Sequence, residues 1–246
     1  MQPKQRKIKQ NKIIMAKKDV TRNVEANDAL NKKEALFIQY RKPILIAVAA
    51  LVVVVLGFFI FKNFYLEPRA NKASTELAKG QQYLETEQYD KALNGDKVSY
   101  AGFLKIAEEY GNTDAGNLAN LYAGICFAKQ NKWNEALKSF ETYSTTDDAL
   151  VAPAAVNAMA AAYANTNQLD KAVDTYKKAA EMADSRAEDG VNNSISPQFL
   201  LYAGDILIQQ GKKDEALKIY QDIKKKYINS MVYQEIDKYI ERASVK

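Results

Sequence analysis

The sequence predicts an all-α protein in which one transmembrane helix precedes a right-handed α-α solenoid that ends in a capping helix. Two observations support this class: an uncharged run of 19 residues covers residues 43–61, and a short motif recurs four times farther along the chain. From them we expect three parts: a basic cytoplasmic tail (1–42), a transmembrane helix (43–64) and a repeat domain (68–246) of about four helical hairpins plus a capping helix.

The composition argues against catalysis. The 246 residues include no histidine and one cysteine, Cys126. The commonest general base and metal ligand is therefore absent, and neither a His-containing triad nor a disulfide can form within the chain. The acidic pairs Glu108-Glu109 and Asp147-Asp148 are adjacent, so their carboxylates do not face each other on a helix. We expect no catalytic residue, no metal site, no cofactor and a buried structural thiol at Cys126.

The uncharged run has the length of a membrane span. At about 1.5 Å per residue, 19 residues extend over roughly 28 Å, close to the hydrocarbon thickness of a bilayer. It lacks the polar face of a core helix in a globular domain. A cleaved signal peptide would need a shorter apolar core followed by small residues, whereas this run ends in FFIFKNFYLEP. We therefore expect an uncleaved anchor.

The charge distribution predicts the orientation of this anchor. Residues 1–42 hold twelve Lys/Arg and four Asp/Glu, or 12 − 4 = +8, in a chain of net charge +5. Lys/Arg counts within twenty residues of the span are equal on its two sides, so the whole tail decides. We expect a cytoplasmic N-terminus and an exported repeat domain. A translation start at Met15 would leave seven Lys/Arg in the tail and preserve this orientation with less margin.

The recurring motif reads EQYDKAL, NKWNEAL, NQLDKAV and GKKDEAL. Its alanines, Ala92, Ala136, Ala172 and Ala216, are 44, 36 and 44 residues apart. Small residues in this pattern let two helices approach closely, and aromatic residues fill the space between hairpins. The small and large apolar residues that recur at these positions in the four units are Gly80 and Tyr83; Ala123, Gly124, Phe127 and Phe140; Ala160, Tyr163, Tyr176 and Ala179; Gly204, Leu207 and Tyr220.

Over roughly residues 70–228 this pattern resembles the tetratricopeptide repeat (TPR) family, whose period is about 34 residues. The spacing of 36 then contains two extra residues, and each spacing of 44 contains about ten. The first unit fits least well, and we interpret its inserted LNGDKVSY as a lengthened hairpin turn. The proline usual near the end of each repeat is missing. Another α-α solenoid or an irregular helical bundle would be the alternative.

The segment between the third and fourth units, SRAEDGVNNSISPQ, predicts an exposed loop. After the fourth unit, INSMVYQEIDKYIER predicts the capping helix that a solenoid end requires. Its apolar face would hold Met231, Val232, Ile236, Tyr239 and Ile240.

The TPR resemblance implies a groove lined by the first helix of each hairpin. It lacks the rows of Lys/Arg that clamp a peptide's terminal carboxylate, so we expect an extended peptide or a helix held by asparagines and apolar contacts. No nucleic acid is expected, because the tyrosines occupy repeat positions and are not interleaved with basic residues. The candidate groove residues are Leu121, Ile125, Lys129, Asn157, Ala161, Asn165, Leu201, Asp205 and Gln209.

The whole layout resembles membrane-anchored TPR proteins of Bacteroidetes-type bacteria, on the stretch from ALNGD through FLKIAEEYG to LYAGIC. It is also similar to the anchored TPR subunit that accompanies the bacterial Sec translocon and periplasmic chaperones. This implies an inner-membrane adaptor whose repeat domain binds translocon components, chaperones or exported proteins in the periplasm. The rival interpretation is a self-associating structural component of a division or outer-membrane assembly complex. The sequence names neither the partner nor the oligomeric state.

Overall fold

The computed structural model describes residue 15 and residues 40–245, and these residues form helices without any β-strand. The chain divides into two units, Met1–Leu66 and Glu67–Lys246. Most of the basic tail expected over residues 1–42 lies outside the described residues.

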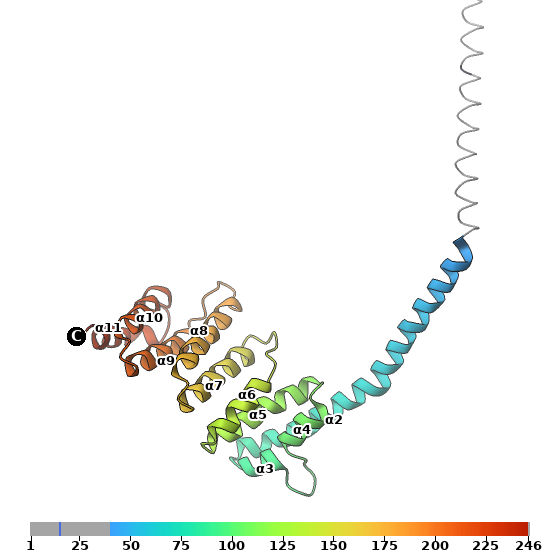
Figure 1. The fold of residues 1–246 in the computed structure, drawn as a ribbon, viewed down its shortest axis with the longest axis horizontal. Coiled ribbons are helices and arrows are strands. Elements are labelled where there is room, and N and C mark those ends of the chain that lie inside the picture. Colours follow the sequence, from blue (N-terminus) through green and yellow to red (C-terminus); the bar gives the residue numbers. More distant parts are fainter. Residues whose placement is uncertain (1–14, 16–39, 246) are drawn as a thin grey trace, which may run out of the picture. The chain divides into compact units, whose positions relative to one another are not determined.

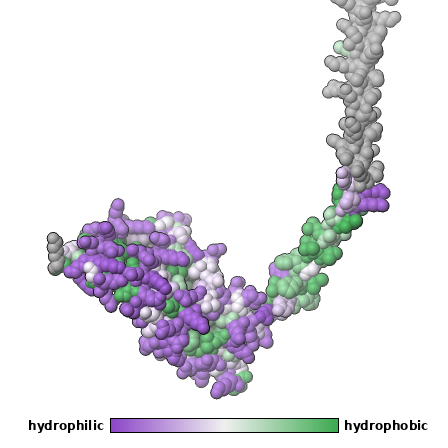
Figure 2. Space-filling view, in the orientation of Figure 1, coloured by the Kyte–Doolittle hydropathy of each residue, from purple (hydrophilic) through white to green (hydrophobic). Residues whose placement is uncertain are grey.

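The apolar run of the first unit is helical. Residues 40–61 form an α-helix, and the π-helix η1 (Lys62–Leu66) follows directly. Within the described part of the chain, the helix Tyr40–Glu85 is the one that is long and apolar enough to cross a membrane. Apolar side chains cover the surface of its first part, whereas polar side chains dominate the visible surface of the second unit (Figure 2).

The second unit is a helical solenoid in which helices that follow one another in sequence pack against each other (Figure 1). The predicted fold class is confirmed. The helices are α2 (Glu67–Glu85), α3 (Tyr89–Asn94), α4 (Phe103–Tyr110), α5 (Asp114–Lys129), α6 (Trp133–Thr142), α7 (Val151–Asn165), α8 (Leu169–Ser185), α9 (Ser196–Gln209), α10 (Lys213–Lys226), the 3-10 turn η2 (Val232–Gln234) and α11 (Ile236–Ser244).

The hairpin turns share one backbone conformation. Glu87, Asn131, Asn167 and Gly211 have positive φ angles of 57°, 60°, 60° and 75°. In each turn the next residue donates its N–H to a carbonyl five residues back, as Gln88 N does to Tyr83 O at 2.8 Å and Lys212 N does to Leu207 O at 2.8 Å. A left-handed residue after the last helical turn satisfies carbonyls that the helix leaves unpaired. These four residues have the same spacing as the motif alanines, so the motif marks the start of each second helix.

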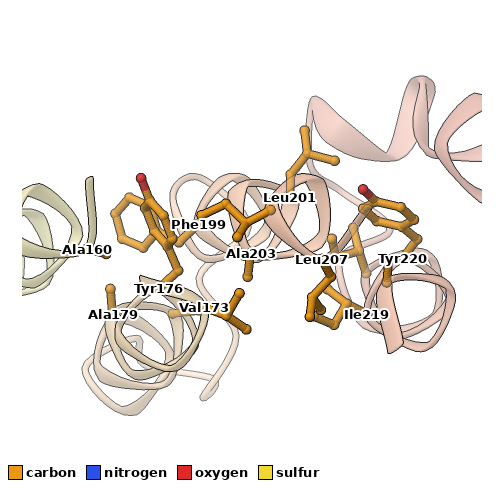
Figure 3. Close-up of a cluster of buried hydrophobic side chains, with 14 of the residues drawn as sticks. Ala160, Val173, Tyr176, Ala179, Phe199, Leu201, Ala203, Leu207, Ile219 and Tyr220 are labelled. Carbon is orange, nitrogen blue, oxygen red and sulfur yellow. The ribbon is translucent and has the colours of Figure 1, made fainter. Parts of the chain in front are cut away.

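Inside each hairpin, a small residue of the first helix faces an aromatic ring of the second. A Cβ atom on Gly124 would lie 2.4 Å from the Phe140 ring, and one on Gly204 would lie 2.3 Å from Tyr220. The third hairpin uses Ala160, which is fully buried beside Tyr176 (Figure 3). The close approach that the small residues predicted is therefore present.

The first hairpin corrects one prediction. Its turn lies at Glu87, as in the other hairpins, and residues 95–102 separate α3 from α4. The insertion thus interrupts the second helix, and its interpretation as a lengthened hairpin turn was wrong. The packing contact survives the interruption, because a Cβ atom on Gly80 would lie 2.4 Å from Phe103.

A single carboxylate organises the inserted segment. Asp96 Oδ1 accepts hydrogen bonds from the backbone N–H groups of Val98 at 2.9 Å, Ser99 at 2.8 Å and Tyr100 at 2.8 Å. Its Oδ2 accepts from the hydroxyl groups of Ser99 and Tyr83, both at 2.9 Å. These bonds, with the one from Val98 first, hold the pKa of Asp96 well below its usual range.

The C-terminal end is covered by α11, but this helix is shorter than expected. It buries Ile236 and Ala243, and its Tyr239 packs against Tyr220 with ring centroids 5.6 Å apart. The preceding residues form a turn in which Ser230 Oγ donates to Tyr227 O at 2.8 Å, so the capping helix begins at Ile236. Met231 is 80% exposed and does not belong to the buried face on which we expected it.

Candidate protein-binding surface

The first helices of the hairpins, α2, α5, α7 and α9, carry a set of equivalent positions that are not buried. In each helix we count from the small residue that contacts the aromatic ring. The four positions lie six and two residues before this residue and one and five residues after it. None of these sixteen residues is buried, and we call them the open face. They are Ser74, Ala78, Gln81 and Glu85; Leu118, Tyr122, Ile125 and Lys129; Ala154, Ala158, Ala161 and Asn165; Gln198, Tyr202, Asp205 and Gln209.

Most of the residues predicted from sequence fall on this face: Ile125, Lys129, Ala161, Asn165, Asp205 and Gln209. Leu121 and Leu201 do not, because they are only 5% and 7% exposed and pack in the hydrophobic core. Asn157 occupies the position equivalent to these two leucines. Sequence reasoning missed Leu118, Tyr122, Ala158 and Tyr202, although the same repeat register could have identified them.

The open face has few charges. Glu85, Lys129 and Asp205 are its three charged residues, and Asp205 Oδ1 already accepts a hydrogen bond from the Tyr220 hydroxyl at 3.0 Å. Asn165 Nδ2 donates to Ala161 O of its own helix at 2.8 Å. With Lys129 its single cation, this face has no pair of basic groups to hold a terminal carboxylate.

Two tyrosines frame its centre. Tyr122 of α5 packs on Phe103 with ring centroids 5.4 Å apart, and its hydroxyl accepts a hydrogen bond from Gln81 Nε2 at 2.6 Å. Tyr202 of α9 is 41% exposed and packs on Tyr176 at 5.5 Å. The equivalent residue of α7 is Ala158. Between the two tyrosine-bearing helices, α7 therefore presents only the small side chains of Ala154, Ala158 and Ala161 before Asn165.

Other hollows lie between successive second helices. The hollow between α8 and α10 has a volume of about 790 Å³, and the one between α4 and α6 about 620 Å³. The larger one has Leu200 and Ile219 among its apolar lining residues, with both lysines and acids around them. At its end Asp184 accepts hydrogen bonds from Lys226 and from the Tyr227 hydroxyl.

These contacts decide the ionisation of Asp184. Burial raises the pKa of this carboxyl, but the hydrogen bonds, led by the one from Lys226, outweigh burial and hold the pKa below its usual value. Cys126 is fully buried, and burial raises the pKa of its thiol to about 12. Across the described residues, no group of three or more His, Cys, Asp or Glu side chains is placed to hold a metal ion.

Comparison with known families locates one repeat. The tetratricopeptide repeat family model matches residues 198–230, which comprise most of α9 and all of α10. This hairpin is similar to a tetratricopeptide repeat. The match supports a TPR protein, and TPR hairpins serve as scaffolds for protein–protein interaction. The α5–α6 and α7–α8 hairpins share the turn and the small-residue contact of the matched hairpin. No curated protein matches the chain.

Proposed function

We propose that this protein is a membrane-anchored scaffold that binds other proteins of the cell envelope through its open face. The observation that carries the proposal is the open face itself: sixteen equivalent residues on four successive first helices remain unburied. A scaffold surface needs side chains that are free to contact a partner, and apolar and amide groups supply contact area and hydrogen bonds without fixed charge.

The finer proposal is an adaptor that holds an exported protein, a periplasmic chaperone or a translocon component near the inner membrane. The apolar helix within Tyr40–Glu85 supports the membrane location. The twelve Lys/Arg of residues 1–42 support a cytoplasmic N-terminus and therefore a periplasmic TPR domain. We include in this proposal that the protein comes from a Bacteroidetes-type bacterium and that it is similar to the anchored TPR subunit of the Sec translocon.

The capped C-terminal end favours an adaptor over a self-associating component. Solenoids that stack end to end would have to join their uncovered last repeats. Here α11 buries Ile236 against the last hairpin, and the outward side of α11 carries Asp237, Lys238 and Glu241.

Photo-crosslinking in intact cells tests this function. A photoreactive residue replaces Ala161 on the open face or, as the matched control, Asp174, which is exposed on the second helix of the same hairpin. We expect discrete adducts with envelope or exported proteins from position 161 and none of these from position 174. Adducts with cytosolic proteins only, or the same adducts from both positions, would contradict the proposal. Protease digestion of the TPR domain in spheroplasts checks the orientation independently.

A further inference from the structure

The connections between hairpins lie along one edge of the solenoid, and the chain enters the solenoid at the same edge. First and second helices alternate in direction, so the start of α2 and the connections after α4, α6, α8 and α10 share this edge. Hydrogen bonds link its neighbouring parts. Arg69 Nε of α2 donates to Asn112 Oδ1 at 3.3 Å, and the Asn117 carboxamide of α5 binds both backbone groups of Ser144. We call it the anchor edge, and it comprises residues 67–70, 111–113, 143–151, 186–195 and 227–235.

The links continue to the C-terminal end of the solenoid. Arg186 Nη1, directly after α8, donates to Asp148 O at 2.9 Å in the connection after α6. Asp184, near the end of α8, accepts a hydrogen bond from the Tyr227 hydroxyl at 2.7 Å. The connection after α10 therefore lies on the edge at which the chain arrives from the apolar helix.

The two edges of the solenoid differ in their exposed apolar side chains. The four hairpin turns on the opposite edge, residues 86–88, 130–132, 166–168 and 210–212, contain only polar residues and glycine. The anchor edge exposes several large apolar side chains instead, and exposed apolar side chains that gather in one place mark interaction sites. These side chains belong to Leu150, Val151, Ile228, Met231 and Tyr233.

The last connection has a charge pattern of its own. Residues 227–234, which we call the C-terminal turn, contain no charged residue and directly follow Lys224, Lys225 and Lys226. In the connection after α6, by contrast, Asp147 and Asp148 precede the exposed leucine, and the connection after α8 carries two acids as well. Lipid phosphate groups repel carboxylates and attract ammonium groups. Of the anchor edge, the C-terminal turn is thus the part that suits a lipid surface.

The C-terminal turn holds its apolar side chains in fixed positions. Tyr227 and Ser230 are buried, and Ser230 Oγ donates to Tyr227 O at 2.8 Å and accepts from Tyr233 N at 3.1 Å. Between these fixed points, Ile228 and Met231 are 58% and 80% exposed. A surface that is ordered before binding loses little conformational entropy when it binds.

The lysines before the turn are partly neutralised. Lys224 Nζ forms an ion pair with Asp237 at 2.6 Å, and Lys226 forms one with Asp184. No ion pair among the described residues includes Lys225, which is exposed. The turn therefore has one cation available for a lipid phosphate.

We propose that the C-terminal turn docks on the surface of the bilayer that holds the apolar helix. Ile228 and Met231 enter the interfacial region, and the Tyr233 ring lies at the level of the head groups, where tyrosine is enriched. Three apolar side chains are too few to hold a free protein on a membrane, but an anchored chain meets lipid at a high effective concentration. This inference rests on the membrane anchor of the proposed function and goes beyond it.

The proposed contact gives the solenoid a second attachment. Within the solenoid, α2 and α11 lie at opposite ends (Figure 1). The chain enters at α2, and the C-terminal turn directly precedes α11. With the turn on the lipid surface, the anchor edge is attached to the membrane at both ends.

Fluorescence quenching by lipid tests the contact. The full chain is placed in nanodiscs of phosphatidylcholine and phosphatidylglycerol, in which some lipids carry a quencher near the head group. A fluorophore is attached to Asn229→Cys in the C-terminal turn or, as the matched control, to Asp214→Cys, which is exposed at the other end of α10. Cys126 is fully buried and does not react. We expect the label at position 229 to lose about half of its fluorescence and the label at 214 to lose little.

A pair of double variants tests the apolar side chains. Ile228→Ser with Met231→Ser should reduce the quenching at position 229 to that at 214. Val98→Ser with Leu104→Ser, which removes two exposed apolar side chains elsewhere, should leave the quenching unchanged. All four side chains are exposed, so neither double variant should change the melting temperature. Unchanged quenching in the first double variant, or equal quenching at the two labelled positions, would overturn the proposal.

A third label separates this failure from failure of the anchor. If a label at Val53→Cys in the apolar helix is quenched and the label at 229 is not, the anchor stands and the lipid contact fails. If neither label is quenched, the anchor of the proposed function fails together with the inference.

Two further outcomes would assign the C-terminal turn to another occupant and overturn the proposal. Shielding of the label at 229 only in nanodiscs that hold two copies of the chain would assign the turn to a second copy. Crosslinks from a photoreactive residue at position 228 to another protein in intact cells, without quenching by lipid at 229, would assign it to a protein partner.

Discussion

The first and second hairpins make the same glycine–ring contact, although the number of residues between the two contacting positions differs. In the second, 16 residues separate Gly124 from Phe140; in the first, 23 residues separate Gly80 from Phe103. Both pairs bring the ring to the glycine, within 2.4 Å of where a Cβ would lie. The extra residues form the Asp96 segment between α3 and α4, whose backbone N–H groups bond to one carboxylate. The packed contact, and not the continuity of the helix, is what the two hairpins share.

The largest effect should come from removing the ring. Phe103→Ala and Phe140→Ala should each lower the free energy of unfolding by about 3–5 kcal/mol, because both rings are buried and leave cavities. Denaturant titration of the full chain in nanodiscs measures both. A loss for Phe103→Ala below half that for Phe140→Ala would show that the stretched hairpin is packed more loosely than its neighbour.

Filling the glycine position should have a smaller effect. Gly80→Ala and Gly124→Ala add a methyl group against a buried ring, which costs about 1–3 kcal/mol. Alanine has a higher helix propensity than glycine, which stabilises the helix by about 1 kcal/mol. We therefore expect the same titration to show a net decrease of about 1 kcal/mol in the free energy of unfolding. Ala160→Gly is the control and should also lose about 1 kcal/mol, since the third hairpin already accommodates alanine. A gain for Gly124→Ala would contradict the close packing.

The Asp96 segment should make the first hairpin sensitive to acid. Because folding lowers the pKa of Asp96, this group stabilises the folded state above the ordinary carboxyl pKa of about 4. That contribution is lost as the pH falls toward the folded-state value. Asp96→Asn should lower the melting temperature at pH 7, and the difference from the wild type should shrink at pH 3. Equal differences at the two pH values would contradict this role.

The smallest effect concerns the hairpin turns. Glu87 has a left-handed backbone, whereas the second and third hairpins use asparagine there. Asparagine tolerates this conformation better than glutamate, so Glu87→Asn should stabilise the chain by less than about 1 kcal/mol. Asn131→Glu should destabilise it by a similar amount. Thermal denaturation of both variants checks the pair, and changes of the same sign would refute the explanation.

The sequence predicted the features that depend on neighbours along the chain. The alanine spacing revealed the repeat, and the recurring small residues predicted the close helix contacts. The inserted residues near Asp96 were wrongly assigned to the hairpin turn. The spacing between motif alanines shows how many residues are added, but it does not show where the helix is interrupted. The capping helix was predicted too long, because the turn at Ser230 depends on hydrogen bonds that the apolar pattern does not show.

The candidate surface was predicted only in part, for a related reason. The register placed Ile125 and Ala161 correctly on first helices, but Leu121 and Leu201 are buried. Each residue rotates the side-chain direction by about 100°, so whether a position faces solvent depends on how its helix is set against the next. The sequence alone determined an apolar segment long enough to span a membrane, a repeat and its period. Only the tertiary structure decided which faces of the helices stay open and that Asn157 stands where the other hairpins bury leucine.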